Sequence, residues 1–180
     1  MTLLRISFKH FLKTEFFSRL TQRTKPPDEA NNTAIHSYLA ADLAEFIRQQ
    51  LVANGISFTY ETVMSHKSKI DFLQTAKEQG YRIYLYFVAT ENPEINISRV
   101  NVRVAQHGQN VAPDVIINRY FRSLQQLYAA VKISNRAYIW DNSDTASLLI
   151  AEITDGENVI IMDTDKVPNW FVKYLVNNED

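Results

Sequence analysis

The stretch YRIYLYFVAT, residues 81–90, decides how the chain folds. Apolar, β-branched and aromatic side chains follow one another almost without interruption, and the only charge is that of Arg82. Near-continuous runs of this kind are typical of strands that are covered on both faces. We therefore predict a buried strand here, in a sheet with helices on both faces.

The segments on either side of this strand alternate between helical and extended patterns. Helices are predicted at residues 34–55, 65–80, 93–106 and 113–132, and strands at 56–60 and 136–143. The first two helices end in glycine, Ser65 stands where it would cap the second, and the last two open on proline. Strands separated by helices of this length predict an α/β fold with a three-layer, parallel sheet.

The C-terminal part of the chain has a different pattern. Residues 147–162 read as a β-hairpin that turns across Asp155-Gly156-Glu157, and residues 167–176 read as a closing helix. We expect this hairpin and helix to complete one edge of the sheet.

The N-terminal part reads as a separate segment. Residues 24–32, TKPPDEANN, indicate a linker, and before it apolar residues from Leu4 to Leu20 recur at helical spacing among basic side chains. We predict a basic amphipathic segment over 1–33, followed by an α/β domain over 34–180. The helix of the first segment either packs on the domain or lies on a membrane or a partner.

Composition excludes several classes of function. The 180 residues carry a net charge of -1, so no general basic field argues for nucleic acid. The chain has no cysteine, which rules out disulfides and thiolate sites and agrees with a reducing cytoplasm. No apolar run approaches the roughly 20 residues that span a bilayer.

Two polar clusters follow predicted strands: Glu61-Thr62, and Asp141 with Asn142 and Ser143. Ligands of open parallel sheets bind beyond the carboxyl ends of the strands. An ionised carboxylate accepts hydrogen bonds, so Glu61 is a candidate for binding a sugar or ribose hydroxyl. The alternative is that Glu61 caps the following helix or pairs with Lys67 or Lys69.

Four arginines form a second candidate site. Arg99 and Arg103 share one face of a predicted helix, and Arg119 and Arg122 share a face of the next. The glycine-bearing segment 106–113 joins the two helices. Guanidinium groups match phosphate oxygens, so the pair of helices could form a lid over phosphates, although solvated arginines on helix surfaces are the alternative.

The histidines and serines do not indicate other chemistry. The histidines at positions 10, 36, 66 and 107 lack the paired spacing of zinc ligands and are expected to be surface or capping residues. No serine lies in a glycine-flanked nucleophile elbow. We predict neither a metal site formed by histidines nor a Ser-His-Asp triad.

From residue 34 to about 176 the ordered motifs resemble the zeta toxin family of P-loop kinases, in the branch described as predicted ABC-type ATPases. The resemblance is carried by ISFTYETVMSHKSK, the strand at 81–90, NVAPDVIINRYFRSL and AYIWDNS. It implies a P-loop kinase-like fold, ATP and Mg²⁺ as cofactors, phosphorylation of a hydroxyl on a substrate such as a UDP-amino sugar, and an antitoxin as a protein partner.

The resemblance also implies roles for single residues. Glu61, with Thr62, takes the position of the substrate-binding glutamate, and Arg103 and Arg119 take the positions of the phosphate-binding, catalytic arginines. Arg99, Arg122 and Gln109 are further lid or phosphate residues. The lid departs from the family pattern, since His107-Gly108-Gln109 is followed by Asn-Val-Ala.

The beginning of the chain departs further from the family. Its four glycines are at positions 55, 80, 108 and 156, whereas a P-loop needs glycines before its Lys-Ser/Thr pair. The nearest imitation, Ser7 to Thr14, has Ser7 and Leu12 at the glycine positions, and the only candidate for the catalytic aspartate is Asp28. Two hypotheses follow: an impaired kinase, or a truncated, non-catalytic remnant that binds a sugar nucleotide or a protein.

Overall fold

The computed structural model describes residues 2–6, 42–108 and 110–177. The chain divides into two units, one formed by Met1–Ser7 with Thr59–Asp180 and the other by Phe8–Phe58. In the second unit, a helix covers residues 42–53 and buries Leu51 and Val52. The predicted boundary at 33/34 lies outside the described residues and stays a prediction.

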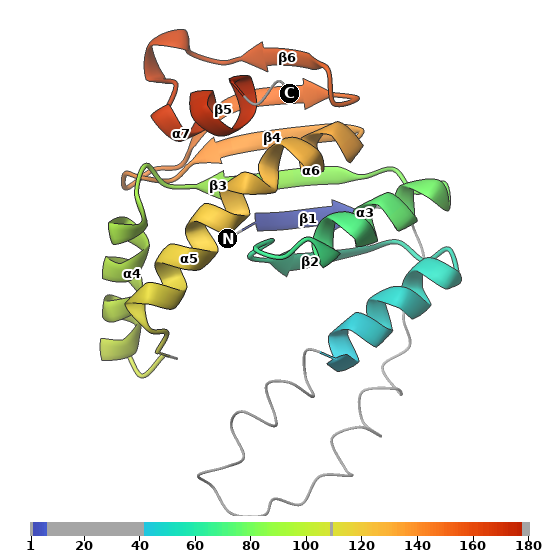
Figure 1. The fold of residues 1–180 in the computed structure, drawn as a ribbon, viewed down its shortest axis with the longest axis horizontal. Coiled ribbons are helices and arrows are strands. Elements are labelled where there is room, and N and C mark those ends of the chain that lie inside the picture. The colour runs from blue at the N-terminus through green and yellow to red at the C-terminus, as the bar shows by residue number, and fades with distance from the viewer. Residues whose placement is uncertain (1, 7–41, 109, 178–180) are drawn as a thin grey trace, which may run out of the picture. The chain divides into compact units, whose positions relative to one another are not determined.

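A six-stranded sheet with the order β2-β1-β3-β4-β5-β6 forms the centre of the first unit (Figure 1). Its strands are β1 (Thr2–Ile6), β2 (Phe58–Thr62), β3 (Tyr84–Ala89), β4 (Arg136–Asp141), β5 (Leu148–Thr154) and β6 (Asn158–Ile161). The decisive stretch of the sequence is thus β3, and the hairpin predicted over 147–162 is β5 with β6. The predicted α/β class is confirmed.

The strand directions differ from the parallel sheet that we predicted. β3 and β4 are parallel, whereas β5 runs antiparallel to β4 and to β6. Figure 1 shows the arrow of β2 pointing the same way as those of β3 and β4. The sheet is mixed because a short hairpin adds its last two strands, and short connections join antiparallel neighbours.

β1 is the largest departure from the sequence prediction. Residues 2–6, which we included in a helical pattern, form a strand that lies between β2 and β3 and runs antiparallel to β3. Over five residues, a helical spacing of apolar side chains only weakly favours a helix, and the hydrogen bonds of strand pairing with β3 outweigh this preference. The rest of the predicted N-terminal helix lies outside the described residues.

The helices of the first unit are α3 (Ser68–Glu78), α4 (Pro93–Ala105), α5 (Pro113–Gln125), α6 (Leu127–Ile133) and α7 (Asn169–Phe171), which continues as a π-helical turn, η2 (Val172–Val176). Pro93 and Pro113 begin their helices as predicted. The helix predicted over 113–132 divides at Gln126 into α5 and α6.

The start of α3 corrects the prediction that Ser65 caps this helix. The helix begins at Ser68, and its Lys67 N-cap makes no side-chain cap bond. The Nδ1 atom of His66 instead accepts a hydrogen bond of 3.2 Å from the backbone N–H of Ser68. The expectation that this histidine is a surface or capping residue is therefore confirmed.

The core lies between the sheet and one layer of helices. In Figure 1, α3, α5, α6 and α7 lie on the face of the sheet that is turned to the viewer. The strand side chains below them are almost fully buried: Leu85, Phe87, Ala137, Ile139 and Ile153. Alternate side chains face the other way, where Tyr86 and Tyr138 stack with ring centroids 5.0 Å apart and stay half-buried.

Within the described part of the chain, no helix combines the length and the apolar character that crossing a bilayer requires.

Candidate functional site

The carboxyl ends of β2, β3 and β4 lie at one edge of the sheet, which we call the carboxyl edge. Polar residues follow each strand there, as the sequence predicted. Two bonds join the ends of β3 and β4: the N–H of Asn142 donates to the carbonyl of Ala89 at 2.8 Å, and the N–H of Glu91 donates to Ser143 Oγ at 2.8 Å. This edge is where ligands of α/β sheets bind.

Asp141 is occupied by contacts within the protein. Its Oδ1 accepts from the N–H of Ser143 at 3.0 Å, and its Oδ2 accepts from Ser143 Oγ and from Trp170 Nε1, each at 3.0 Å. Trp170 is 3% exposed, so its indole N–H needs this partner. The cluster at Asp141 therefore holds α7 and the turn after β4 in place.

Glu91, which the sequence analysis did not single out, belongs to the same network. Its Oε1 accepts a bond of 2.8 Å from Asn169 Nδ2. Asn169 and Trp170 are consecutive in α7, so this helix contacts the loops after both β3 and β4. The N-terminal end of α7 thereby clamps the carboxyl edge.

The carboxylate of Glu61, unlike that of Asp141, is not occupied by contacts within the described residues. The Glu61 side chain is exposed, and within the described residues its carboxylate makes no hydrogen bond or ion pair. The alternatives of a helix cap or a pair with Lys67 or Lys69 are therefore not realised there. Thr62 Oγ1 accepts from the N–H of Met64 at 3.3 Å, which leaves the hydroxyl hydrogen of Thr62 available for another partner.

The loop after β2 is held in an unusual conformation. Met64 has φ 54, which a bulky side chain rarely adopts, and it is only 1% exposed. The carbonyl of the preceding residue, Val63, accepts a bond of 2.6 Å from Ser123 Oγ in α5. Burial of Met64 and this bond together fix the path of the chain directly after Glu61.

The two helices that carry the arginines pack against each other as α4 and α5. Arg99 donates to the carbonyl of Asp144 at 3.4 Å, which places it beside the carboxyl edge. The stem of Arg103 lies against Gly108, where an added Cβ would come 2.4 Å from Arg103 Cγ. Arg119 and Arg122 are exposed on α5, and Gln109 lies outside the described residues.

Tyr120, next to Arg119, connects α5 to the loop after β3. Its hydroxyl donates to the carbonyl of Thr90 at 2.8 Å and lies 3.1 Å from the carbonyl of Glu91. Burial, and then the nearby charge of Glu91, raise the pKa of the Tyr120 phenol well above its ordinary value. The hydroxyl is therefore a neutral donor at physiological pH.

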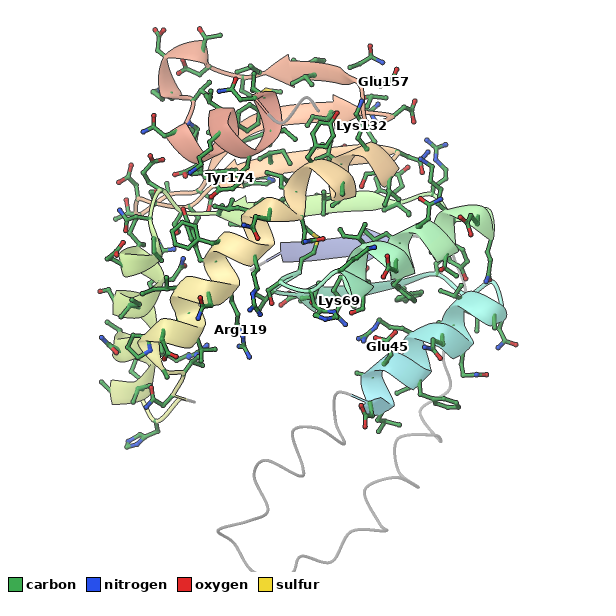
Figure 2. All side chains as sticks on the ribbon, in the orientation of Figure 1. Glu45, Lys69, Arg119, Lys132, Glu157 and Tyr174 are labelled. Atoms are coloured by element: carbon green, nitrogen blue, oxygen red, sulfur yellow. The ribbon has the colours of Figure 1, made fainter. Side chains whose placement is uncertain are left out.

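One helix links two parts of the predicted site. Arg119 lies on α5 (Figure 2), and Ser123 on the same helix bonds the loop that follows Glu61. Sequence reasoning missed Tyr120, Ser123 and Trp170 as contact residues, because hydroxyl and indole groups in helices carry no spacing signal. The roles assigned to Glu61, Thr62 and the arginines stay predictions.

ATP and Mg²⁺ do not fit the described residues at this edge. A phosphate cradle forms where a strand ends and a helix begins, with glycines in the connecting loop. β1 pairs Arg5 with Tyr84, the first residue of β3, so β1 ends at the edge opposite to Glu61. Among the described residues, no glycine-bearing loop joins a strand to a helix at the carboxyl edge.

The sheet and its helices form a mixed α/β fold that is consistent with a P-loop kinase-like domain. The sequence model of the zeta toxin family matches residues 17–149. The chain therefore belongs to the zeta toxin family, whose members are kinase-like phosphotransferases.

A protein from Haemophilus influenzae (strain ATCC 51907 / DSM 11121 / KW20 / Rd), described as uncharacterized, is 35% identical over 69 residues. The match covers 38% of this chain and 49% of that protein, so the chain spans about half the length of this curated relative. No solved structure matches the chain.

Proposed function

We propose that this member of the zeta toxin family binds a sugar nucleotide, such as a UDP-amino sugar, at the carboxyl edge, and that its phosphotransfer activity is impaired. Glu61 accepts hydrogen bonds from sugar hydroxyls, with Thr62 beside it. Arg103 and Arg119 hold the phosphates, with Arg99 and Arg122 as further contacts. The observation that carries the proposal is the exposed Glu61 carboxylate at the end of β2, directly before a loop that is bonded to the helix of Arg119.

The chemistry of these groups supports the assignment. Charged hydrogen bonds to a carboxylate contribute more than neutral ones, and a hydroxyl of a sugar is a ready donor. Guanidinium groups bind phosphate oxygens through paired N–H donors. A sugar nucleotide carries both features, since its diphosphate is linked directly to a sugar that bears hydroxyls.

The direction of β1 supports the impairment. Phosphoryl transfer depends on positioning and electrostatic stabilisation of the phosphates, so losing the cradle removes the main source of catalysis. Since the described residues of the carboxyl edge form no such cradle, we expect the chain to retain the substrate side of the family's site. An antitoxin is a further partner that family membership suggests.

Isothermal titration with UDP-N-acetylglucosamine tests the proposal. Glu61→Gln removes the charge with little change in shape, and we expect it to weaken binding about tenfold or more, since a charged hydrogen bond contributes about 1.5–3 kcal/mol. Glu157→Gln makes the same chemical change at the exposed hairpin turn, away from Arg119 (Figure 2). Equal affinities of the two variants would remove Glu61 from the site.

A matched pair of arginine variants tests the phosphate end. Arg119→Ala should weaken binding of UDP-N-acetylglucosamine, while Arg82→Ala, at an exposed arginine that precedes β3, should not. A similar loss in both variants would indicate that only the general charge of the protein matters.

A further inference from the structure

One face of α5 is bonded to two loops at the carboxyl edge. Tyr120 and Ser123 are three residues apart and therefore lie on the same face of the helix. Tyr120 bonds the loop after β3, and Ser123 bonds the loop after β2. These two hydroxyls attach the helix that carries Arg119 to the ends of two strands.

The bond from Ser123 is short, and its donor is buried. Ser123 is 8% exposed, and its Oγ lies 2.6 Å from the carbonyl oxygen of Val63. Removing the hydroxyl would leave a carbonyl without this partner beside Met64, whose positive φ is already unfavourable. The conformation of the loop therefore depends on Ser123.

The same bond relates Glu61 to Arg119. Arg119 is four residues before Ser123, one helical turn away on the same side of α5, with about 5–6 Å between their Cβ atoms. Glu61 is two residues before Val63. A single hydrogen bond thus joins the short segment that carries the carboxylate to the turn of helix that carries the guanidinium group.

We propose that Ser123 is a positioning residue that sets the spacing between Glu61 and Arg119. In this role it touches no ligand itself, and it fixes the two ends of the binding site relative to each other before the ligand arrives. The inference rests on the proposed function for its ligand, but the bond can be tested in the protein alone. Tyr120 holds the same helix from the loop after β3 and keeps α5 from shifting.

Hydrogen exchange of the ligand-free protein tests the positioning directly. Ser123→Ala should speed exchange of the Met64 backbone amide, which donates to Thr62 Oγ1, by at least about fivefold, because the loop loses a hydrogen bond that holds it. Ser123→Thr keeps a hydroxyl and should retain slow exchange. Unchanged exchange in Ser123→Ala would overturn the positioning role, whatever ligand the protein binds.

A double-mutant cycle tests the effect on binding. In the native background, Ser123→Ala should weaken UDP-N-acetylglucosamine binding about tenfold, whereas in the Glu61→Gln background it should weaken it far less, since the positioned group is gone. Ser134→Ala is the matched control, because Ser134 is also buried and donates a bond of 2.7 Å, to Ala130 within α6. It should lower the melting temperature without changing affinity.

The outcomes separate the two proposals. Additive losses in the cycle, or an equal loss of affinity in Ser134→Ala, would show that Ser123 contributes only general stability and would overturn the inference. No binding of UDP-N-acetylglucosamine by the native protein would overturn the proposed function, and the exchange experiment would still decide whether Ser123 holds the loop.

Discussion

Glu61 and Asp141 are two carboxylates at the carboxyl ends of β2 and β4, which β1 and β3 separate in the sheet, and they differ in what surrounds them. Asp141 accepts three hydrogen bonds from Ser143 and Trp170. Glu61 is exposed and has no such partner among the described residues. By position in the sequence the two are similar, since each lies at the carboxyl end of a strand.

The difference separates a structural carboxylate from one that is available to a ligand. A carboxylate whose lone pairs are used by buried donors stabilises the fold and has little capacity left for a ligand. An exposed carboxylate at the end of a strand, before a loop that is held by burial and by a hydrogen bond, keeps its acceptors available to a ligand. The comparison therefore gives Asp141 a role in stability and agrees with the binding role that we propose for Glu61, and each role can be tested.

The largest expected effect is a loss of stability on replacing Trp170, which donates a hydrogen bond to Asp141. Trp170→Ala removes a 3% exposed indole that packs against Phe87 and Phe171, so it should reduce the free energy of unfolding by about 3–5 kcal/mol. Denaturant unfolding monitored by circular dichroism measures this. Trp170→Phe keeps much of the packing and should cost less; an equal loss would mean that the bond to Asp141 dominates.

The next effect compares the two carboxylates directly. Asp141→Ala leaves the buried indole N–H of Trp170 unpaired and should cost about 1–3 kcal/mol of stability. Glu61→Ala should change stability by no more than about 0.5 kcal/mol, as is usual for exposed positions. Equal losses in urea unfolding would erase the distinction between the two residues.

A smaller effect is expected at Gly108, beside the phosphate end of the proposed site. A Cβ there would meet Arg103 Cγ at 2.4 Å and the carbonyl oxygen of Arg103 at 2.8 Å. Gly108→Ala should therefore displace the Arg103 stem and destabilise the end of α4 by about 1 kcal/mol. Binding of UDP-N-acetylglucosamine should weaken as well, and unchanged titration curves would remove Arg103 from the site.

The smallest effect is a pH dependence that Tyr120 introduces. The pKa of its phenol is raised in the folded protein above the ordinary value of about 10, so the folded state holds this proton more tightly. The contribution of the protonated Tyr120 phenol to the free energy of unfolding is fully present below about pH 10 and is lost as the pH rises above that value. Between about pH 9.5 and 11, the free energy of unfolding should fall more steeply for the native protein than for Tyr120→Phe. If the two proteins lose stability in parallel with pH, the raised pKa of Tyr120 is contradicted.

Much of the fold could be predicted from the sequence. The run at 81–90 gave β3, the prolines marked the starts of α4 and α5, and Asp155-Gly156-Glu157 marked the turn between β5 and β6. These signals are local, because a proline or a glycine restricts the backbone at its own position.

The site could be predicted only in part. The positions of Glu61 and Asp141 at strand ends follow from chain order, but their different surroundings depend on Trp170 and Ser123, which are distant in sequence. The direction of β1 could not be predicted either, since five residues carry no helical or extended period strong enough to outweigh tertiary pairing.

The central claim is our proposal that the carboxyl edge binds a sugar nucleotide and that its described residues form no cradle for ATP, since β1 runs antiparallel to β3. Isothermal titration of the native protein with ATP and Mg²⁺ tests it most directly. We predict no measurable heat of binding under conditions in which UDP-N-acetylglucosamine binds. Micromolar binding of ATP would contradict the claim and would favour an active kinase.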